Sequence, residues 1–503
     1  MSDNPAPPSG LPIPLLVDAA TGKAFPPLPA ASLQYLGGDL RGAGNRAARA
    51  KESGHLAVDY TVSDPNDLSQ TGWCVLFAND AQAVAEKQQL MPLLNLREKQ
   101  VQDPSGRLFQ IFEGDKGVKL NQTAENWAMY RGVSLTAPVS PAKGVPYYIL
   151  IVGGPERITF EFQHLLKMQW VVGRLAFDDI ADYGRYAQAV VEYESKDFQP
   201  FQRRNAAIWV TRNGDPATAM LSGAICPEFN DKDNWLGSQS KFTLDAFIHD
   251  NAADKQATKE QLKNILRGNI ENGPPAVFFT GSHGADFSAS DEATQRQRVG
   301  SLYTQDWIYG TAPPGDNDLF SATDIPDDAQ LQGSIAFIFA CYGGGCPAID
   351  SYYLNTDGSP HQIAPAPMVA KLPQALLSHG VLAVIAHVDM AWSFTFVDTN
   401  GTPQVQALRT PLELLMQGNR AGFAADSLSL AWSTLSAQLG LKFGSFALSA
   451  AAAALGAGGA ATASQLNTKD ATDLANRTIA RDDARNYIVL GDPAVRLRVD
   501  DLS

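Results

Sequence analysis

The chain has 503 residues, 45% hydrophobic and 18% charged, which is typical of a soluble folded protein with room for two or three domains. A formal net charge of -14 provides no basic surface, which argues against nucleic acid and anionic membrane as main partners. Four cysteines are too few for a disulfide framework, and the first residues have neither a basic region nor an apolar core. These features predict a cytoplasmic protein.

The first part of the chain divides into two predicted regions. Residues 1–65 predict an extended lead-in rich in Pro, Ala and Gly, to which no function is assigned. Residues 66–196 predict a smaller α/β subdomain, because apolar runs alternate with segments of helical spacing. Its expected strands are WCVLFA from Trp73, YYILIV at 147–152 and VGRLAF at 172–177, and its expected helices are 80–94 and 180–194.

Residues 200–503 predict the main α/β domain. Expected strands lie within AAIWV at 206–210 and at 242–248, 276–280, 334–340 and 381–388, and expected helices at 259–266 and 368–378. Gly268 is the expected C-cap of the first of these helices. Strands separated by helices or long crossovers predict a parallel sheet with helices on both faces.

The last hundred residues show helical spacing, followed by one more strand. Residues 446–464 are rich in Ala and Gly, which carry little transfer free energy, so they predict a packed helix and a flexible turn rather than a membrane insertion. The closing segment NYIVLGDPAVRLRV predicts a strand and a turn that Asp492 fixes.

Two strand ends in the main domain carry residues that suit catalysis. Residues 335–340 form a continuous apolar run, as expected for a strand buried on both faces, and Cys341 follows with three glycines close behind. The run AVFFT ends in GSHG, which places His283 at another strand exit. Because the carboxyl ends of parallel strands meet at one edge of a sheet, the thiol and the imidazole are expected to be neighbours. An imidazole that ionises a thiol and then protonates a leaving amine supplies what thiol acyl transfer needs.

The motifs around these two residues resemble those of a known family. His283-Gly284 and Ala340-Cys341 are similar to the motifs of caspase-like cysteine peptidases of the caspase–hemoglobinase fold. Phe339 and Tyr342 depart from the narrower caspase signature, so cleavage after Asp is not implied and the gingipain-like branch fits better. The resemblance runs unevenly from about residue 147 to 499, and the closing segment also resembles CHAT-type catalytic domains.

The resemblance implies a parallel-sheet sandwich with helices on both faces, preceded by a smaller α/β subdomain. It implies a bacterial-type endopeptidase acting on protein or peptide substrates through a Cys341/His283 dyad and a thioester, without metal or organic cofactor. The backbone N–H groups of Gly284 and Cys341 are the expected oxyanion donors. Asp389 and Trp392 are placed at the S1 pocket, where a carboxylate would select Arg or Lys at P1.

Several alternatives stay open. Asp389 can instead cap the next element or pair with a structural Arg, and the whole chain can be an inactive caspase-like scaffold that binds a partner. His387 is interpreted as a pocket-edge or structural residue. Cys341 and Cys346 lack the second Cys pair that a tetrahedral metal site would need. Cys74, His55 and His164 receive no chemical role.

Residues 285–332, between the two dyad strands, form a long insert rich in Asp, Gly and Pro. An insert of this length is usually functional or disordered. Its aspartates lack the spacing of a calcium loop and indicate a solvated acidic surface. Arg296 and Arg298 are candidate self-cleavage points if the enzyme accepts basic residues.

Overall fold

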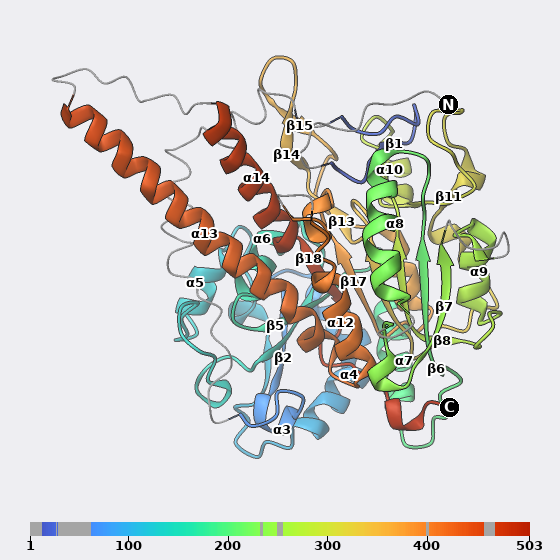
Figure 1. The fold of residues 1–503 in the computed structure, drawn as a ribbon. Helices are drawn as coiled ribbons and strands as arrows, with labels where there is room; N and C mark the ends of the chain where they lie inside the picture. The colour runs from blue at the N-terminus through green and yellow to red at the C-terminus, as the bar shows by residue number, and fades with distance from the viewer. Residues whose placement is uncertain are drawn as a thin grey trace.

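The computed structural model describes residues 13–26, 28, 62–231, 235–248, 255–398, 402–456 and 468–503. Its centre is a ten-stranded sheet with the order β3-β2-β4-β5-β18-β17-β12-β8-β6-β7 (Figure 1). The strands are β2 (Trp73–Phe77), β3 (Phe109–Phe112), β4 (Tyr148–Val152), β5 (Val171–Leu175), β6 (Arg203–Val210), β7 (Thr243–Ile248), β8 (Pro275–Gly281), β12 (Ile335–Phe339), β17 (Ala383–His387) and β18 (Tyr487–Gly491).

The sheet consists of two parallel sets that run in opposite directions. The strands β3, β2, β4, β5 and β18 pair parallel to one another, and so do β17, β12, β8, β6 and β7. The two sets meet at β17 and β18, which pair antiparallel, for example with Ile385 opposite Val489. The α/β fold with a mainly parallel sheet is therefore confirmed, and the pairing is antiparallel at this junction. The last strand of the chain joins the N-terminal set, so both parts of the chain share one sheet.

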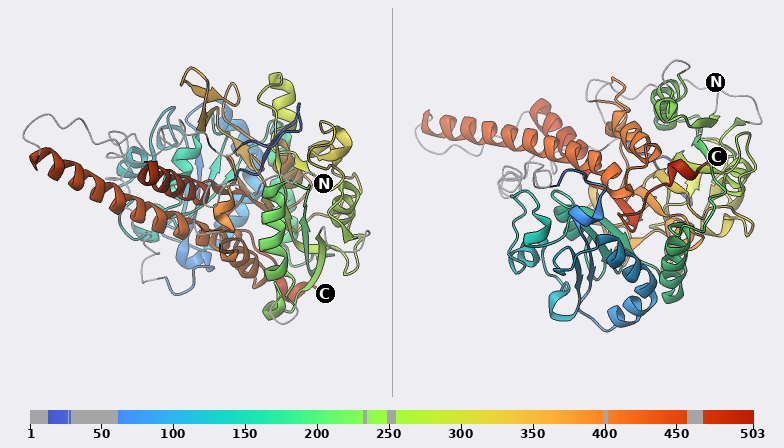
Figure 2. Two further views of the ribbon diagram at one scale, coloured as in Figure 1. Left: turned by 45° about the horizontal axis from the view of Figure 1, so that its top comes forward. Right: turned by 90° about the horizontal axis from the view of Figure 1, so that it is seen from below.

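Helices cover both faces of this sheet, as the composition of its strands requires (Figure 2). On one face α4 (Gln82–Val101) packs on α7 (Ile180–Tyr193), which contacts α11 (Lys371–Ser378); on the other, α13 (Ala421–Gly456) lies against β5 and β18. The remaining α-helices of the described residues are α3 (Leu68–Thr71), α5 (Ala124–Met129), α6 (Phe160–Leu166), α8 (Pro216–Phe229), α9 (Lys259–Arg267), α10 (Glu292–Arg298), α12 (Gln406–Met416) and α14 (Thr468–Arg485).

Most expected helices are confirmed, and one begins later than expected. Gly268 caps α9 in a left-handed conformation with φ 72°, as expected of a glycine in that position. The helix expected from residue 368 begins at Lys371, because Met368–Val369 pair as β16 with β13 (Gly345–Cys346). In Figure 1, α13 projects from the body beside α14. Within the described residues, no helix has both the length and the apolar character needed to cross a membrane, and residues 457–464 of the predicted Ala-rich segment lie outside them.

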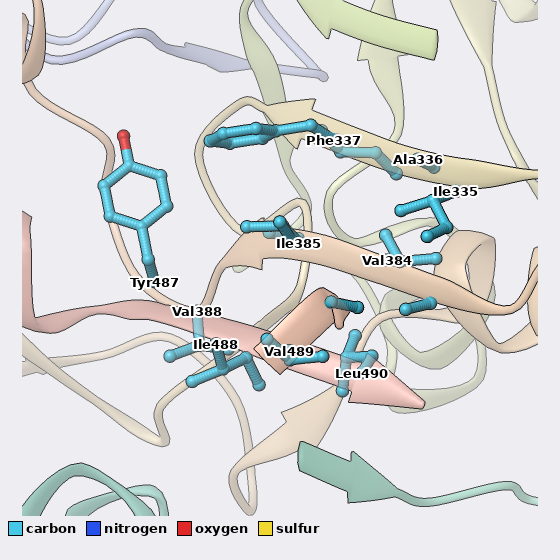
Figure 3. Packing of buried hydrophobic residues seen from close by; sticks show 14 of the residues in the cluster. Ile335, Ala336, Phe337, Val384, Ile385, Val388, Tyr487, Ile488, Val489 and Leu490 are labelled. Carbon is cyan, nitrogen blue, oxygen red and sulfur yellow. The ribbon is translucent and has the colours of Figure 1, made fainter. Parts of the chain in front are cut away.

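The core beneath the site is built from β12, β17 and β18 (Figure 3). The side chains of Ile335, Phe337 and Ile385 are fully buried, and Phe337 meets Tyr487 edge-on with ring centroids 6.0 Å apart. Burying one such apolar side chain stabilises the fold by about 1.5–3 kcal/mol. This packing fixes the strands whose carboxyl ends carry Cys341 and its neighbours.

The predicted long insert and part of the predicted lead-in form a second, smaller sheet. Its order is β1 (Leu16–Asp18), β9 (Gly284–Asp286), β10 (Leu302–Tyr303) and β11 (Leu319–Phe320). Residues 13–17 of the predicted extended lead-in are buried against the body. His55 lies outside the described residues.

Asp492, just after β18, ties the C-terminal strand to the N-terminal part of the chain. Besides accepting the Ala494 N–H of the predicted turn, its fully buried carboxylate accepts a hydrogen bond from Trp73 Nε1 at 3.0 Å and pairs with Arg97 Nε at 2.7 Å. Arg97 also forms an ion pair with Glu194. The predicted turn residue therefore also links the C-terminal strand to β2 and α4.

Asp492→Ala should lower the free energy of unfolding by about 3 kcal/mol, because it leaves the buried Arg97 cation with one carboxylate instead of two. Urea unfolding checks this. The control is Glu292→Ala, which removes the exposed partner of Arg296 and should change stability by no more than about 0.5 kcal/mol. Equal losses in the two variants would contradict the role given to Asp492.

Candidate active site

The predicted site residues follow three neighbouring strands, which end at the same edge of the sheet. β12 pairs parallel with β8 on one side and with β17 on the other. Phe339 lies opposite Gly281 in this register, so Cys341 and His283 each stand two residues beyond a paired position. The backbone therefore places both dyad candidates at the carboxyl ends of adjacent strands, as the sequence predicted.

The loops after β8 and β12 touch through Gly284 and Cys341. A Cβ atom on Gly284 would lie 1.8 Å from the carbonyl oxygen of Cys341, a distance no side chain can adopt, so only glycine fits. Tyr342 follows with a φ of 57°, in the left-handed region that non-glycine residues rarely occupy, and its N–H donates to Asp389 O at 2.9 Å. A strained turn thus fixes the backbone of Cys341 against the strand that carries His283.

The Cys341 thiol is fully buried between the β12 loop and the segment after β17. Its Sγ accepts the Ala391 N–H at 3.1 Å and lies 3.5 Å from Ala391 O. Burial raises the pKa of the thiol well above its ordinary value, and the hydrogen bond from Ala391 only partly opposes this effect. In this conformation the thiol is neutral.

His283 is also fully buried, and a carboxylate accompanies it. Its Nε2 lies 2.9 Å from Asp215 Oδ2, as a close ion-pair contact that is not aligned as a hydrogen bond. Asp215 is the N-cap of α8, where it accepts the N–H groups of Ala217 and Thr218. Burial alone would raise the pKa of Asp215, but the adjacent His283 and the hydrogen bonds from Thr218 outweigh this effect and hold the pKa well below its usual range.

Sequence analysis did not single out Asp215. The Asp-Pro pair that starts α8 was visible as a turn after a strand, and Asp is a common N-cap. What was not visible is that β6 pairs with β8, with Val210 opposite Gly281, which brings the start of α8 beside His283. The carboxylate that accompanies His283 therefore comes from a segment far away in the sequence.

The two predicted S1 residues are both buried next to the site. Asp389 Oδ1 accepts the Met390 N–H at 2.8 Å, and Asn486 Nδ2 lies 3.4 Å from its other oxygen. The first of these contacts is local, and the N-cap of the next helical turn, Ser393–Thr395, is Trp392 rather than Asp389. The Trp392 ring meets Tyr352 edge-on with centroids 5.0 Å apart.

Other singled-out residues have structural surroundings. His387 Nδ1 lies 2.8 Å from Asp389 O, and its Nε2 lies 3.1 Å from Asp483 O and 3.2 Å from Asp483 Oδ1, so a buried carboxylate accompanies this imidazole too. His164 and Cys74 are buried, and none of the four cysteines, all within the described residues, forms a disulfide. No group of three or more metal-ligating side chains occurs in the part of the chain that the structure describes. That the proposed activity needs no metal ion stays a prediction.

The chain was compared with known proteins. Residues 146–498 match the family model of peptidase family C25, and no curated protein sequence matches. Among solved structures, the Arg-specific cysteine proteinase gingipain R is 10% identical over 87% of this chain and 80% of its own, with a TM-score of 0.42. A structure described only as a protease is 11% identical over 86% and 80%, with a TM-score of 0.44. The complex of the pro- and mature domains of RgpB from Porphyromonas gingivalis is 10% identical over 85% and 80%, with a TM-score of 0.43.

The family match spans well over half of the chain and includes every strand that positions the candidate site. It covers the region in which the sequence itself resembles gingipain-like peptidases. The chain belongs to peptidase family C25, the gingipain family of cysteine peptidases.

Proposed function

We propose that the chain is a cysteine endopeptidase in which Cys341 is the nucleophile and His283 the acid–base residue. The observation that carries the proposal is the register of β8 and β12, which places both residues at one sheet edge with Gly284 in contact with the Cys341 backbone. In the proposed mechanism His283 takes the thiol proton, and Sγ attacks the substrate carbonyl carbon. The C–N bond then breaks as His283 returns the proton to the leaving amine. Water hydrolyses the resulting thioester.

Asp215 is a positioning residue in this mechanism. Its carboxylate lies against the His283 ring and is held in turn by Thr218 Oγ1 at 2.6 Å. A carboxylate in this place stabilises the imidazolium that forms when His283 accepts the thiol proton. The Gly284 and Cys341 N–H groups are the proposed donors to the oxyanion of the tetrahedral intermediate.

The proposed P1 preference for Arg or Lys depends on Asp389. Burial raises the pKa of this carboxyl group to about 7, and the nearby Asp350 carboxylate adds to the shift. A basic side chain entering beside Asp389 would supply the counter-charge that the buried carboxylate lacks. The arrangement therefore favours binding of a cation over binding of a second acid.

Cys341→Ala should lower kcat/KM for fluorogenic peptides by at least about 10³-fold, and His283→Ala by about 10²- to 10⁴-fold, because the nucleophile or its proton carrier is lost. Cys346→Ala, which removes another buried thiol five residues away, is the matched control and should retain activity. Activity that survives in Cys341→Ala would reject the dyad. If the native chain and all variants are inactive although reagents reach the Cys341 thiol, the result would favour the alternative that the chain is an inactive scaffold.

Hydrolysis of peptides that differ only at P1 tests the specificity. Asp389→Asn should lower kcat/KM for peptides with Arg or Lys at P1 by about 10- to 100-fold, because it removes a charge-assisted hydrogen bond. The kcat/KM for the peptide with Leu at P1 should not change. If the native enzyme prefers Asp, Asn or Leu at P1, the result would contradict the role given to Asp389 in specificity. It would not contradict the proposed dyad.

The buried Asp389 also predicts a pH dependence of stability. Between the ordinary aspartate pKa of 3.8, which holds in the unfolded chain, and the folded pKa of about 7, the folded chain keeps a proton that the unfolded chain has released. The free energy of unfolding therefore falls as pH rises through this window. Asp389→Asn, which does not ionise, should show a smaller fall in urea unfolding between pH 4 and 7, and the exposed Asp115→Asn should behave as the native chain does. An identical fall in Asp389→Asn would show that Asp389 is ionised throughout.

A further inference from the structure

Residues 13–18, here named the cleft segment, lie across the candidate site. In the sequence they lie far before the first strand of the main sheet, β2, which begins at Trp73. All but Asp18 are nevertheless buried, and Leu15 and Leu16 have no exposed surface. Sequence analysis gave this part of the chain no role. Its contacts include Gly284, a proposed oxyanion donor, and Ala391, whose N–H donates to the Cys341 thiol.

The first half of the cleft segment pairs with the backbone after β17 as an added antiparallel strand. The Leu15 N–H donates to Ala391 O at 3.1 Å, and the Ser393 N–H donates to Ile13 O at 3.3 Å. Pro14 between them forms an antiparallel bridge with Trp392. Main-chain pairing of this kind, with alternate side chains directed into the protein, is how clefts bind extended peptides.

The carbonyl group of Leu15 lies at the proposed oxyanion donor. Its oxygen accepts the Gly284 N–H at 3.0 Å. Ala391 O, which accepts the Leu15 N–H, is also the atom that lies 3.5 Å from Cys341 Sγ. The Leu15 backbone is close enough to the thiol to influence its pKa. The peptide group after Leu15 therefore sits where a substrate's scissile peptide group would be held.

The second half of the cleft segment continues along the other side of the site as β1. It pairs parallel with β9, Leu16 opposite Gly284 and Asp18 opposite Asp286, and Tyr303 Oη donates to Val17 O at 3.3 Å. The chain then turns back, with Val17 bridging Ala24. These contacts anchor both sides of Leu15, so the segment covers Cys341 in a defined register.

We propose that the cleft segment is an internal occupant of the substrate cleft, bound as a peptide with Leu15 at the P1 position, and that it shields Cys341 until it is displaced. The peptide-like register rests on the proposed function, whereas the shielding of the thiol does not. Leu15 offers no positive charge to Asp389, so with a basic P1 preference the segment binds without being a good substrate. The protein is then latent as folded.

The test compares the full chain with its Leu15→Asp/Leu16→Asp variant, in which two charges replace side chains buried at an acidic site. The control is Ala20→Asp, an exposed position two residues beyond the cleft segment. Alkylation of Cys341 by iodoacetamide is followed by peptide mapping, and hydrolysis of the P1 peptide series is measured in parallel. Urea unfolding verifies that each variant is folded. If the double variant does not unfold cooperatively, Leu15→Ala, which only truncates the P1 side chain, takes its place.

In the double variant Cys341 should be alkylated at least about tenfold faster than in the native chain, and in Leu15→Ala about threefold faster, because the covering strand opens more often. Ala20→Asp should match the native rate. Peptide hydrolysis should rise in step with alkylation. Equal alkylation rates in all folded forms would overturn the proposal, even if the native chain is an active peptidase. Faster alkylation without hydrolysis would instead support the shielding and reject the proposed function.

Discussion

The parallel pairing of β8, β12 and β17 is the constraint on which the site depends. In the hydrogen-bonded register Phe339 lies opposite Gly281, and this pairing fixes where the residues that follow each strand begin. Gly284 then lies so close to Cys341 that a side chain there would overlap its carbonyl. A shift of one residue in this ladder would turn every side chain to the other face. Both the thiol and the imidazole therefore owe their positions to the buried core beneath them.

A second constraint joins the two halves of the sheet. β18 comes from the end of the chain but runs with the N-terminal strands, and Asp492, just beyond it, ties Trp73 and Arg97 to the same point. Because β17 pairs directly with β18, the strand that leads to Asp389 and Trp392 is supported by the N-terminal part of the chain. The smaller N-terminal region therefore contributes to the rigidity of the candidate pocket, although it supplies none of the proposed catalytic side chains.

The state of the site follows from what covers it. Burial raises the pKa of the Cys341 thiol, while Asp215 keeps its negative charge beside His283. The neutral thiol has no exposed surface, and the His283 ring lies against a buried carboxylate. Displacement of residues 13–18 would expose the thiol to water and remove the main cause of its raised pKa. Access to Cys341, rather than rearrangement of the sheet, is thus the step that would change its reactivity.

The sequence by itself determined the local elements and the chemistry at their ends. Continuous apolar runs identify the buried strands. Cys341 and His283 each follow one of these strands, in a motif formed by adjacent residues. Only the tertiary structure decided which distant segments pair with those strands: Asp215 beside His283, β18 against β17, and Leu15 at Gly284. These contacts join residues tens to hundreds of positions apart, and their energy comes from packing and hydrogen bonds that no local pattern encodes.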